Sequence, residues 1–251
     1  MTLSTYTFGS GSETVVFLHG FCETKEIWKD FTSGLEHDLR GICYDLPGFG
    51  ESELLQHTTI QSVAKTIKED LEKKGEKNVR LIGHSLGGYV ALSLAKQFPE
   101  LVQNVMLFHS SVFSDTEEKK TNRNKTIDFV KKNGVEAFAK TFAPSLFAKP
   151  DQQNQKVALL FDMARQTPAA THIAYSEAMR DREDFADWVS ETDIPFLFIV
   201  GKEDGAVPLE KSKEQIILPK KAKSLVLEGV GHMGILEAPE LCQEFIRKNI
   251  A

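Results

Sequence analysis

The chain has 251 residues and a formal net charge of −6; 41% of its residues are hydrophobic and 26% are charged. This length allows one large core, and the composition is typical of a soluble globular protein. An acidic chain lacks the cationic surface that binds nucleic acid or anionic lipid, so we expect neither as a partner.

Three features of the sequence bear on the compartment in which we expect the protein: the first residues, the length of its apolar runs and its cysteines. The first six residues are polar and lack the basic and apolar regions of a secretion signal. No apolar run in the sequence approaches the roughly 20 residues that span a bilayer. The three cysteines, Cys22, Cys43 and Cys242, are odd in number and widely spaced, which favours buried free thiols over disulfides or metal ligands. We therefore expect a cytoplasmic protein.

Short apolar runs predict the strands in chain order, at residues 6–8, 14–18, 42–44, 79–82, 105–108, 196–200 and 224–227. The first is expected to turn back at the glycines and serines of 9–12 into the second. Apolar residues at helical spacing predict helices between the strands, beginning near Thr24, Ile60, Leu86 and Pro239. This alternation predicts an α/β fold with a mostly parallel, doubly wound sheet that binds ligands at the carboxyl ends of its strands.

One interval, from Ser110 to Asp193, is far longer than a crossover between neighbouring strands requires. Its apolar residues recur at helical spacing on both sides of Gly134, and another helix is expected to begin at 167–168. We expect residues 1–110 and 194–251 to form the core and residues 111–193 to form a helical lid over the sheet edge. A packing layer with no role in substrate binding is the alternative.

The segment Gly83-His84-Ser85-Leu86-Gly87 lies between a predicted strand and a predicted helix. Such a tight turn forces its central serine toward positive φ and presents the hydroxyl at the sheet edge. The flanking glycines allow strand and helix to approach closely. This segment resembles the nucleophile elbow of the α/β-hydrolase superfamily.

The resemblance implies a catalytic triad in the chain order serine, acid, histidine. His232 is the candidate base, because it is the one histidine after the strand at 196–200. Asp204 is the candidate acid, since the segment 201–208 resembles the acid loop of the superfamily, and the neighbouring Glu203 is its rival. His37, His57 and His172 are expected in surface segments.

An oxyanion is expected to bind to two backbone N–H groups. The amide of Leu86 lies at a predicted helix N-terminus, where unpaired donors favour negative charge. The segment His19-Gly20-Phe21 resembles the oxyanion loop of the superfamily, which implies the Phe21 amide as the second donor. We expect His19 to brace this loop and the turn at 45–50 to be structural support.

The resemblance extends from about Val15 to the C-terminus and is to small, lidded serine esterases and lactonases. It implies hydrolysis of small esters, lactones or thioesters through an acyl-enzyme, with water as co-substrate and neither metal nor cofactor. A serine at the elbow argues against alkyl halides and epoxides, which superfamily members with an aspartate there attack. Candidate substrate contacts are His109, Phe142, Phe147 and Met233. The alternatives are a hydrolase of carbon–carbon bonds in β-diketone-like compounds and a non-catalytic ligand-binding protein on the same scaffold. The oligomeric state is not indicated by the sequence.

Overall fold

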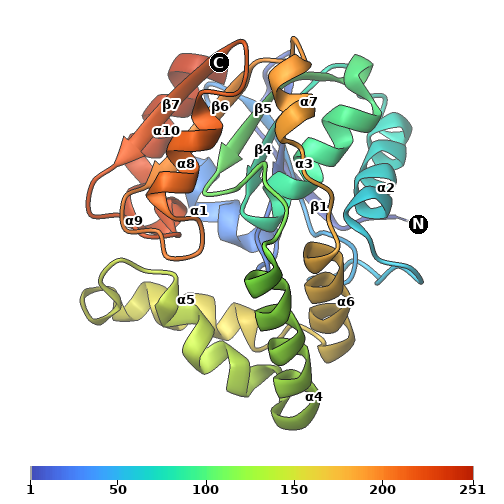
Figure 1. Ribbon diagram of the computed structural model, residues 1–251. Coiled ribbons are helices and arrows are strands. Elements are labelled where there is room, and N and C mark those ends of the chain that lie inside the picture. The colour runs from blue at the N-terminus through green and yellow to red at the C-terminus, as the bar shows by residue number, and fades with distance from the viewer. Residues whose placement is uncertain (1, 251) are drawn as a thin grey trace.

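A seven-stranded sheet forms the centre of the molecule (Figure 1). The structure is a computed structural model that describes residues 2–250. The spatial order of the strands is β1-β3-β2-β4-β5-β6-β7. Their bounds are Thr5–Phe8 for β1, Thr14–Leu18 for β2, Arg40–Tyr44 for β3, Val79–His84 for β4, Val102–Phe108 for β5, Phe196–Gly201 for β6 and Ala222–Leu227 for β7.

All neighbouring strands run parallel except β1, which pairs antiparallel with β3 at the edge of the sheet. The predicted α/β class with a mostly parallel sheet is confirmed. The expected hairpin between β1 and β2 is wrong, because β3 lies between them. Gly9, at a φ of 67°, leads the chain against the backbone of Leu39, and a Cβ there would lie 1.7 Å from the Leu39 carbonyl oxygen.

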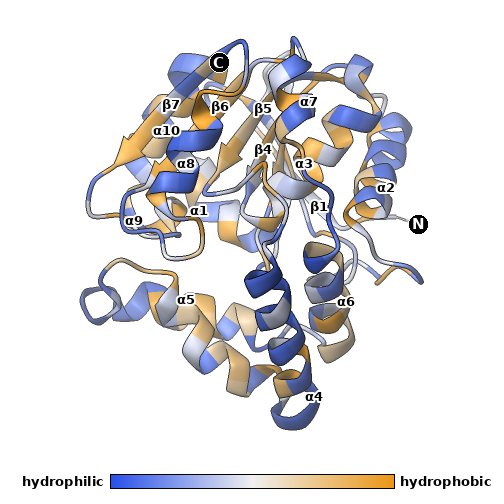
Figure 2. Cartoon of the chain, viewed as in Figure 1, coloured by the Kyte–Doolittle hydropathy of each residue, from blue (hydrophilic) through white to orange (hydrophobic). Residues whose placement is uncertain are grey.

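Helices cover both faces of the sheet, because alternate side chains of the parallel strands are buried on opposite sides. Along β2, Val16 and Leu18 pack in one core cluster, while Val15 and Phe17 pack in the other. The first cluster is covered by α2, α3 and α7, at Ile60–Lys73, Leu86–Gln97 and Ala186–Glu191. The second is covered by α1 and α10, at Lys29–Ser33 and Pro239–Ile250. Figure 2 shows apolar strands between helices whose outer surfaces are hydrophilic.

The helices predicted to begin near Ile60, Leu86 and Pro239 form and begin at those residues. The one expected near Thr24 is a 3-10 helix, η1, at Lys25–Trp28 followed by the five-residue α1. Helix α2 begins at a capping box of Thr59 and Ser62 and is followed by Gly75 at a φ of 77°. Outside the predicted insertion, three short elements were not predicted: η2 at Pro99–Leu101, α8 at Leu209–Ile216 and α9 at Gly234–Glu237.

Between β5 and β6 lie three longer helices that form a layer at one end of the sheet (Figure 1). They are α4 at Glu117–Ser145, α5 at Asn154–Ala164 and α6 at Ala169–Arg180, and the 3-10 helix η3 at Pro150–Gln152 precedes α5. Gly134 kinks α4, with a φ of 80° and a ψ of 165°. The first half of α4 is mostly hydrophilic (Figure 2).

Two expectations concern the chain as a whole. Among the described residues, none of the helices has the length and apolar character to cross a membrane. Cys22, Cys43 and Cys242 are free and buried.

Candidate active site

Ser85 lies on the turn between β4 and α3, with a φ of 49° and a ψ of −113°. A residue with a Cβ is strained in this conformation, as expected for a nucleophile elbow. The glycines on either side are required sterically. A Cβ on Gly83 would lie 2.4 Å from the Gly87 backbone, and one on Gly87 would lie 2.2 Å from the Leu18 carbonyl oxygen. The Ser85 backbone is held by its own N–H, which donates to the Phe108 carbonyl oxygen at 2.9 Å.

Asp204 and His232 follow β6 and β7, and the structure brings them together. The Nδ1 of His232 lies 2.8 Å from Oδ2 of Asp204. The other carboxylate oxygen, Oδ1, accepts the N–H groups of Ala206 and Val207, each at 2.8 Å. Burial opposes ionisation of Asp204, but His232 and the hydrogen bonds to the carboxylate hold the pKa of this side chain well below its usual range. Asp204 is therefore ionised at neutral pH, whereas the side chain of its rival Glu203 is exposed.

His109 was expected to contact substrate, but its ring turns toward Asp204. Its Nδ1 lies 3.1 Å from the same Oδ2 atom that His232 contacts. His109 is 1% exposed and its Nε2 has no hydrogen-bond partner. Burial lowers the pKa of His109 to about 4 despite the adjacent carboxylate, so the ring is neutral at pH 7.

His109, Asp204 and His232 each place one potential ligand atom within 4.8 Å of the others, so a metal ion is one conceivable occupant of this cluster. The Nδ1 atom of His109 and the Nδ1 atom of His232 both lie at hydrogen-bond distance from Oδ2 of Asp204. All three side chains are buried. The two Nδ1 atoms and Oδ2 of Asp204, which are the atoms a metal ion would need, are thus already paired with one another.

The loop after β2 carries the candidate oxyanion donor Phe21. His19 braces this loop: its Nε2 accepts the Leu46 N–H at 3.0 Å, and its Nδ1 donates to the Gly20 carbonyl oxygen at 2.8 Å. Among residues 2–250, the backbone N–H groups of Phe21 and Leu86 have no acceptor in the hydrogen-bond network outside helices and strands. One unpaired amide follows β2 and the other lies at the N-terminus of α3, directly after Ser85, and an oxyanion requires two such donors.

The turn at 45–50, expected to be structural, holds an ion pair. Asp45 accepts the backbone N–H of Lys25 at 2.7 Å and its Nζ at 2.8 Å. The Glu51 N–H also donates to Asp45, at 3.0 Å. These contacts fix the turn against η1.

A buried ion pair between Glu23 and His84 was missed by sequence reasoning. Their side chains are 1% and 0% exposed, and His84 Nδ1 lies 3.1 Å from Glu23 Oε2. The Gly20 N–H donates to the same oxygen at 2.7 Å, and His84 Nε2 donates to the His232 carbonyl oxygen at 3.0 Å. Burial alone would lower the pKa of His84, but the Glu23 carboxylate raises it. The pair thus joins the oxyanion loop, the elbow and the His232 loop.

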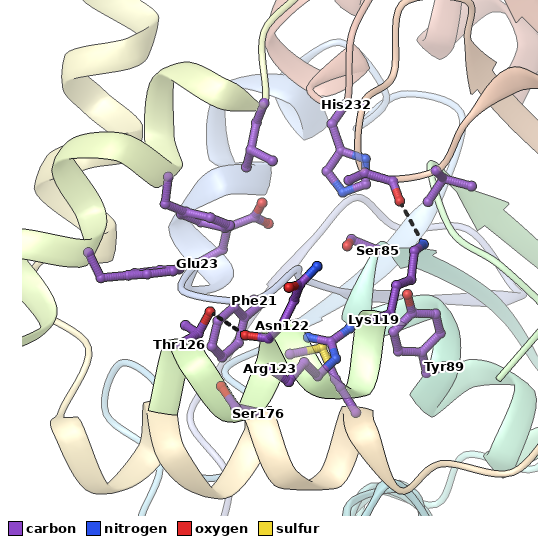
Figure 3. Close-up of a pocket in the computed structure, with 17 residues that line it drawn as sticks. Phe21, Glu23, Ser85, Tyr89, Lys119, Asn122, Arg123, Thr126, Ser176 and His232 are labelled. Carbon is purple, nitrogen blue, oxygen red and sulfur yellow. Dashed lines mark hydrogen bonds between the residues drawn. The ribbon is translucent and has the colours of Figure 1, made fainter. Parts of the chain in front are cut away.

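Ser85 and His232 line the same cavity, of about 320 Å³, at the carboxyl end of the sheet (Figure 3). Its apolar part is formed by Phe21, Phe138, Phe142, Leu146 and Met179. Its polar part includes Lys119, Asn122, Arg123, Thr126 and Ser176. Helices α4 and α6 therefore supply much of the wall that faces the sheet.

A family model described as the alpha/beta hydrolase fold matches residues 13–239. The chain belongs to this family. The predicted membership is thereby confirmed, from a match that covers nearly the whole chain.

Several curated relatives of this α/β-hydrolase are similar over most of their length. A putative 2-succinyl-6-hydroxy-2,4-cyclohexadiene-1-carboxylate synthase of Bacillus subtilis is 27% identical, over 92% of the chain and 88% of the relative. A pimeloyl-[acyl-carrier protein] methyl ester esterase of Sodalis glossinidius is 24% identical, over 94% of the chain and 93% of the relative. The chain spans only 65% of a third relative, the dihydrolipoyllysine-residue acetyltransferase component of the acetoin cleaving system of Pseudomonas putida.

Solved structures agree with the fold. A thermophilic esterase from Thermogutta terrifontis superposes with a TM-score of 0.92 and 26% identity, over 98% of this chain and 92% of the other. An enol-lactonase from Burkholderia xenovorans, at 18% identity, superposes with a TM-score of 0.90, over 98% and 95% of the two chains, and shows the shared fold alone.

Of the four candidate substrate contacts, one lines the cavity. Phe142 lines it, whereas His109, Phe147 and Met233 do not. Phe147 and Met233 are 6% and 0% exposed and pack in a core cluster of the sheet. We therefore retain only Phe142 as a candidate contact. Lys119 and Asn122 of α4 and Tyr89 of α3 also line the cavity but were not predicted. The two α4 residues lie far from Ser85 in the sequence, and only the folded chain brings them to the same cavity.

His172, expected at the surface, is instead fully buried on α6. Its ring centroid lies 4.8 Å from that of Phe21 and 4.6 Å from that of Phe138. Neither ring nitrogen has a hydrogen-bond partner. Burial lowers the pKa of His172 to about 4.

This burial predicts an acid-sensitive contribution to stability. The unfolded chain binds a proton at His172 near pH 6.5 and the folded chain only near pH 4, so the contribution is present above pH 6.5 and is lost as the pH falls toward 4. At pH 5 the loss is about 2 kcal/mol. His172→Leu should remove this term, which urea unfolding at pH 7.5 and pH 5 measures. His37→Leu, at an exposed histidine, is the control. An equal loss of stability on acidification in wild type and His172→Leu would contradict the prediction.

Proposed function

We propose that this α/β-hydrolase cleaves small carboxylic esters by acyl transfer, with Ser85 as nucleophile, His232 as base and Asp204 as the group that orients the base. The observation that carries the proposal is the 2.8 Å hydrogen bond between His232 and the buried Asp204, on a cavity that His232 shares with Ser85. The names of two relatives, a methyl ester esterase and a thermophilic esterase, support the ester class.

The proposed cycle begins with proton transfer. With the Nδ1 proton of His232 directed at Asp204, the Nε2 lone pair accepts the Ser85 proton as Oγ attacks the ester carbonyl carbon. The carbonyl oxygen becomes an oxyanion, which the N–H groups of Phe21 and Leu86 stabilise. His232 then returns its proton to the leaving alcohol. A water molecule, deprotonated by His232, then attacks the acyl-enzyme carbonyl carbon; the bond to Ser85 Oγ breaks, His232 returns the proton to Oγ, and the carboxylic acid is released. The same steps apply to lactones and thioesters.

We further propose that residues 111–193 act as a lid that selects the substrate. Helix α4 contributes Phe138 and Phe142 to the cavity, and α6 contributes Ser176 and Met179. A ligand in contact with Ser85 is therefore bounded by side chains of these helices.

The test combines a chemical probe with a substrate panel. A fluorophosphonate should label Ser85, and wild type should turn over p-nitrophenyl esters, lactones and methyl esters of graded chain length, with a β-diketone as the carbon–carbon substrate. Preferential cleavage of esters supports the proposal. Cleavage of the β-diketone alone would favour carbon–carbon hydrolysis, and labelling without turnover of any compound would favour a binding protein.

A further inference from the structure

The first half of α4 presents a polar stripe to the cavity. Lys119, Asn122, Arg123 and Thr126 all line it, and their spacing of three, four and seven residues places them on one side of the helix. Figure 3 shows these side chains in the space near Ser85 and Tyr89. After the kink at Gly134, the same helix instead presents Phe138 and Phe142. One end of the cavity is thus polar and the other aromatic.

The hydrogen-bond donors on this stripe are largely uncommitted. Lys119 Nζ contacts only the Ala206 carbonyl oxygen, at 3.2 Å, and no carboxylate of residues 2–250 lies within ion-pair distance of it. The side-chain amide of Asn122 has no hydrogen bond within the described chain. Lys119 and Asn122 are exposed residues on the cavity lining, and an ammonium and an amide without an anionic partner are the donor types that bind a carboxylate.

The surrounding charges leave a cationic excess. Arg123 pairs through Nε with Asp115, but Asp115 also pairs with Arg182, at 2.8 Å, so two guanidinium groups share one carboxylate. Glu23 is the acidic side chain on the cavity lining, and it is already engaged by His84 and the Gly20 amide. Lys119 therefore adds a positive charge that no neighbouring acid offsets.

We propose that the ester substrate carries a carboxylate, remote from the scissile bond, which binds at the stripe of Lys119, Asn122 and Arg123 while an apolar segment packs on Phe138 and Phe142. This inference rests on the proposed ester hydrolysis and narrows it to anionic esters. A cavity of about 320 Å³ suits a small substrate of this kind. A neutral ester would leave the lysine ammonium without a counter-charge.

The experiment compares monomethyl esters of straight-chain dicarboxylic acids with methyl alkanoates of equal length, with acid release followed by titration. Acetate esters of hydroxy acids place the carboxylate on the alcohol side instead. Only one of these two anionic series can place its carboxylate at the stripe while the ester reaches Ser85. For that series we expect kcat/KM to be about tenfold or more higher than for the neutral esters. This preference should decrease as salt is added, because salt screens the attraction between charges. Lys119→Ala should reduce kcat/KM for the anionic esters about tenfold, through KM, and should reduce kcat/KM for the neutral esters by a much smaller factor.

Lys125→Ala is the matched control, because Lys125 lies exposed on the same helix and does not line the cavity. It changes the net charge equally but should not alter the preference. Equal turnover of neutral and anionic esters, or equal loss on both in Lys119→Ala, would overturn the inference while the proposed hydrolysis stands. If Ser85 is not labelled and no ester in any series is cleaved, the proposed function itself fails.

A second inference rests on separate geometry, the shared oxygen of Asp204. Oδ2 receives His232 Nδ1 at 2.8 Å and His109 Nδ1 at 3.1 Å. His109 is held there with a φ of 50°, and its N–H donates to the Ile199 carbonyl oxygen at 2.9 Å. A non-glycine residue is strained in this conformation, and such strain is typical of positions where the side chain must be held in one place for function. Because its Nε2 is buried without a partner, His109 offers one neutral donor to the carboxylate.

We infer that His109 is a positioning residue that fixes Asp204 and, by donating to the same oxygen, limits how strongly Asp204 favours a protonated His232. The other ionisable groups facing His232 are His84, with a ring centroid 5.2 Å away, the Glu23 that pairs with His84, and Lys119 on the cavity. None of these contacts Asp204 directly. Removal of the His109 donor should therefore make the carboxylate a stronger partner for the imidazolium.

His109→Leu and His109→Asn form the test pair, since asparagine keeps a donor near the Nδ1 position and tolerates positive φ. In His109→Leu, the pH at which kcat/KM falls on the acidic side (the acidic limb) of its pH profile should be higher by about half to one pH unit. KM should remain near that of wild type. His109→Asn should restore the wild-type limb. If both variants lose activity with no shift of the limb, or both shift alike, His109 has only a packing role.

Discussion

Ser85→Ala is expected to lower kcat for a p-nitrophenyl ester by about 10⁶-fold, the scale seen when the nucleophile of a serine triad is removed. The physical reason is that, in the proposed mechanism, the Ser85 hydroxyl supplies the attacking atom, and among the described residues Ser85 is the one on the turn between β4 and α3 with a φ of 49°. The measurement is single-turnover kinetics, with loss of fluorophosphonate labelling as a second readout.

Ser85→Gly separates lost chemistry from lost folding. Glycine adopts a φ of 49° without the strain that any side chain causes, so this variant should be equally inactive yet about 1 kcal/mol more stable in urea. Turnover within tenfold of wild type in either variant would exclude Ser85 as the nucleophile.

Asp204→Asn is expected to reduce kcat by about 10⁴-fold with the fold intact, the effect of the corresponding change in a serine protease triad. Because Oδ1 accepts two backbone N–H groups, the amide oxygen of asparagine will occupy that position. The NH₂ group then faces both histidines, so His232 must accept at Nδ1 and carry its proton on Nε2. That tautomer cannot take the proton from Ser85.

The tautomer change can be observed directly by ¹⁵N NMR of the His232 ring alongside the kinetics. Glu203→Gln is the matched control, since Glu203 is the adjacent, exposed rival carboxylate, and its activity should equal that of wild type. A large loss in Glu203→Gln with little loss in Asp204→Asn would reverse the assignment of the acid.

The sequence predicts much of this fold because its strands and helices are locally encoded. The run before Ser85 and the apolar stripe after it give β4 and α3 directly, and the long interval after Ser110 predicts the added helices. Asp204 and His232 could be proposed because the resemblance implies an acid and then a histidine after the serine, and each of the two follows a predicted strand. Parallel topology then brings strand ends together, even though 28 residues separate the two side chains in the chain.

Contacts between distant segments could not be predicted in the same way. His109 follows a strand, as a substrate contact would, but the direction of its ring depends on its backbone torsion and on the carboxylate across from it. His172 lies in a polar segment, and its burial follows only from the packing of α6 against Phe21 and Phe138. No local pattern distinguishes Glu23 from a surface glutamate.

The Glu23–His84 pair also makes activity a sensor of complete folding. It links residues 61 apart in sequence, and the His84 ring reaches a carbonyl group 148 residues further along. The segments it joins belong to the beginning, middle and end of the chain. A chain in which only the early strands have assembled therefore has no complete site, and recovery of turnover after dilution from denaturant should coincide with the last structural phase.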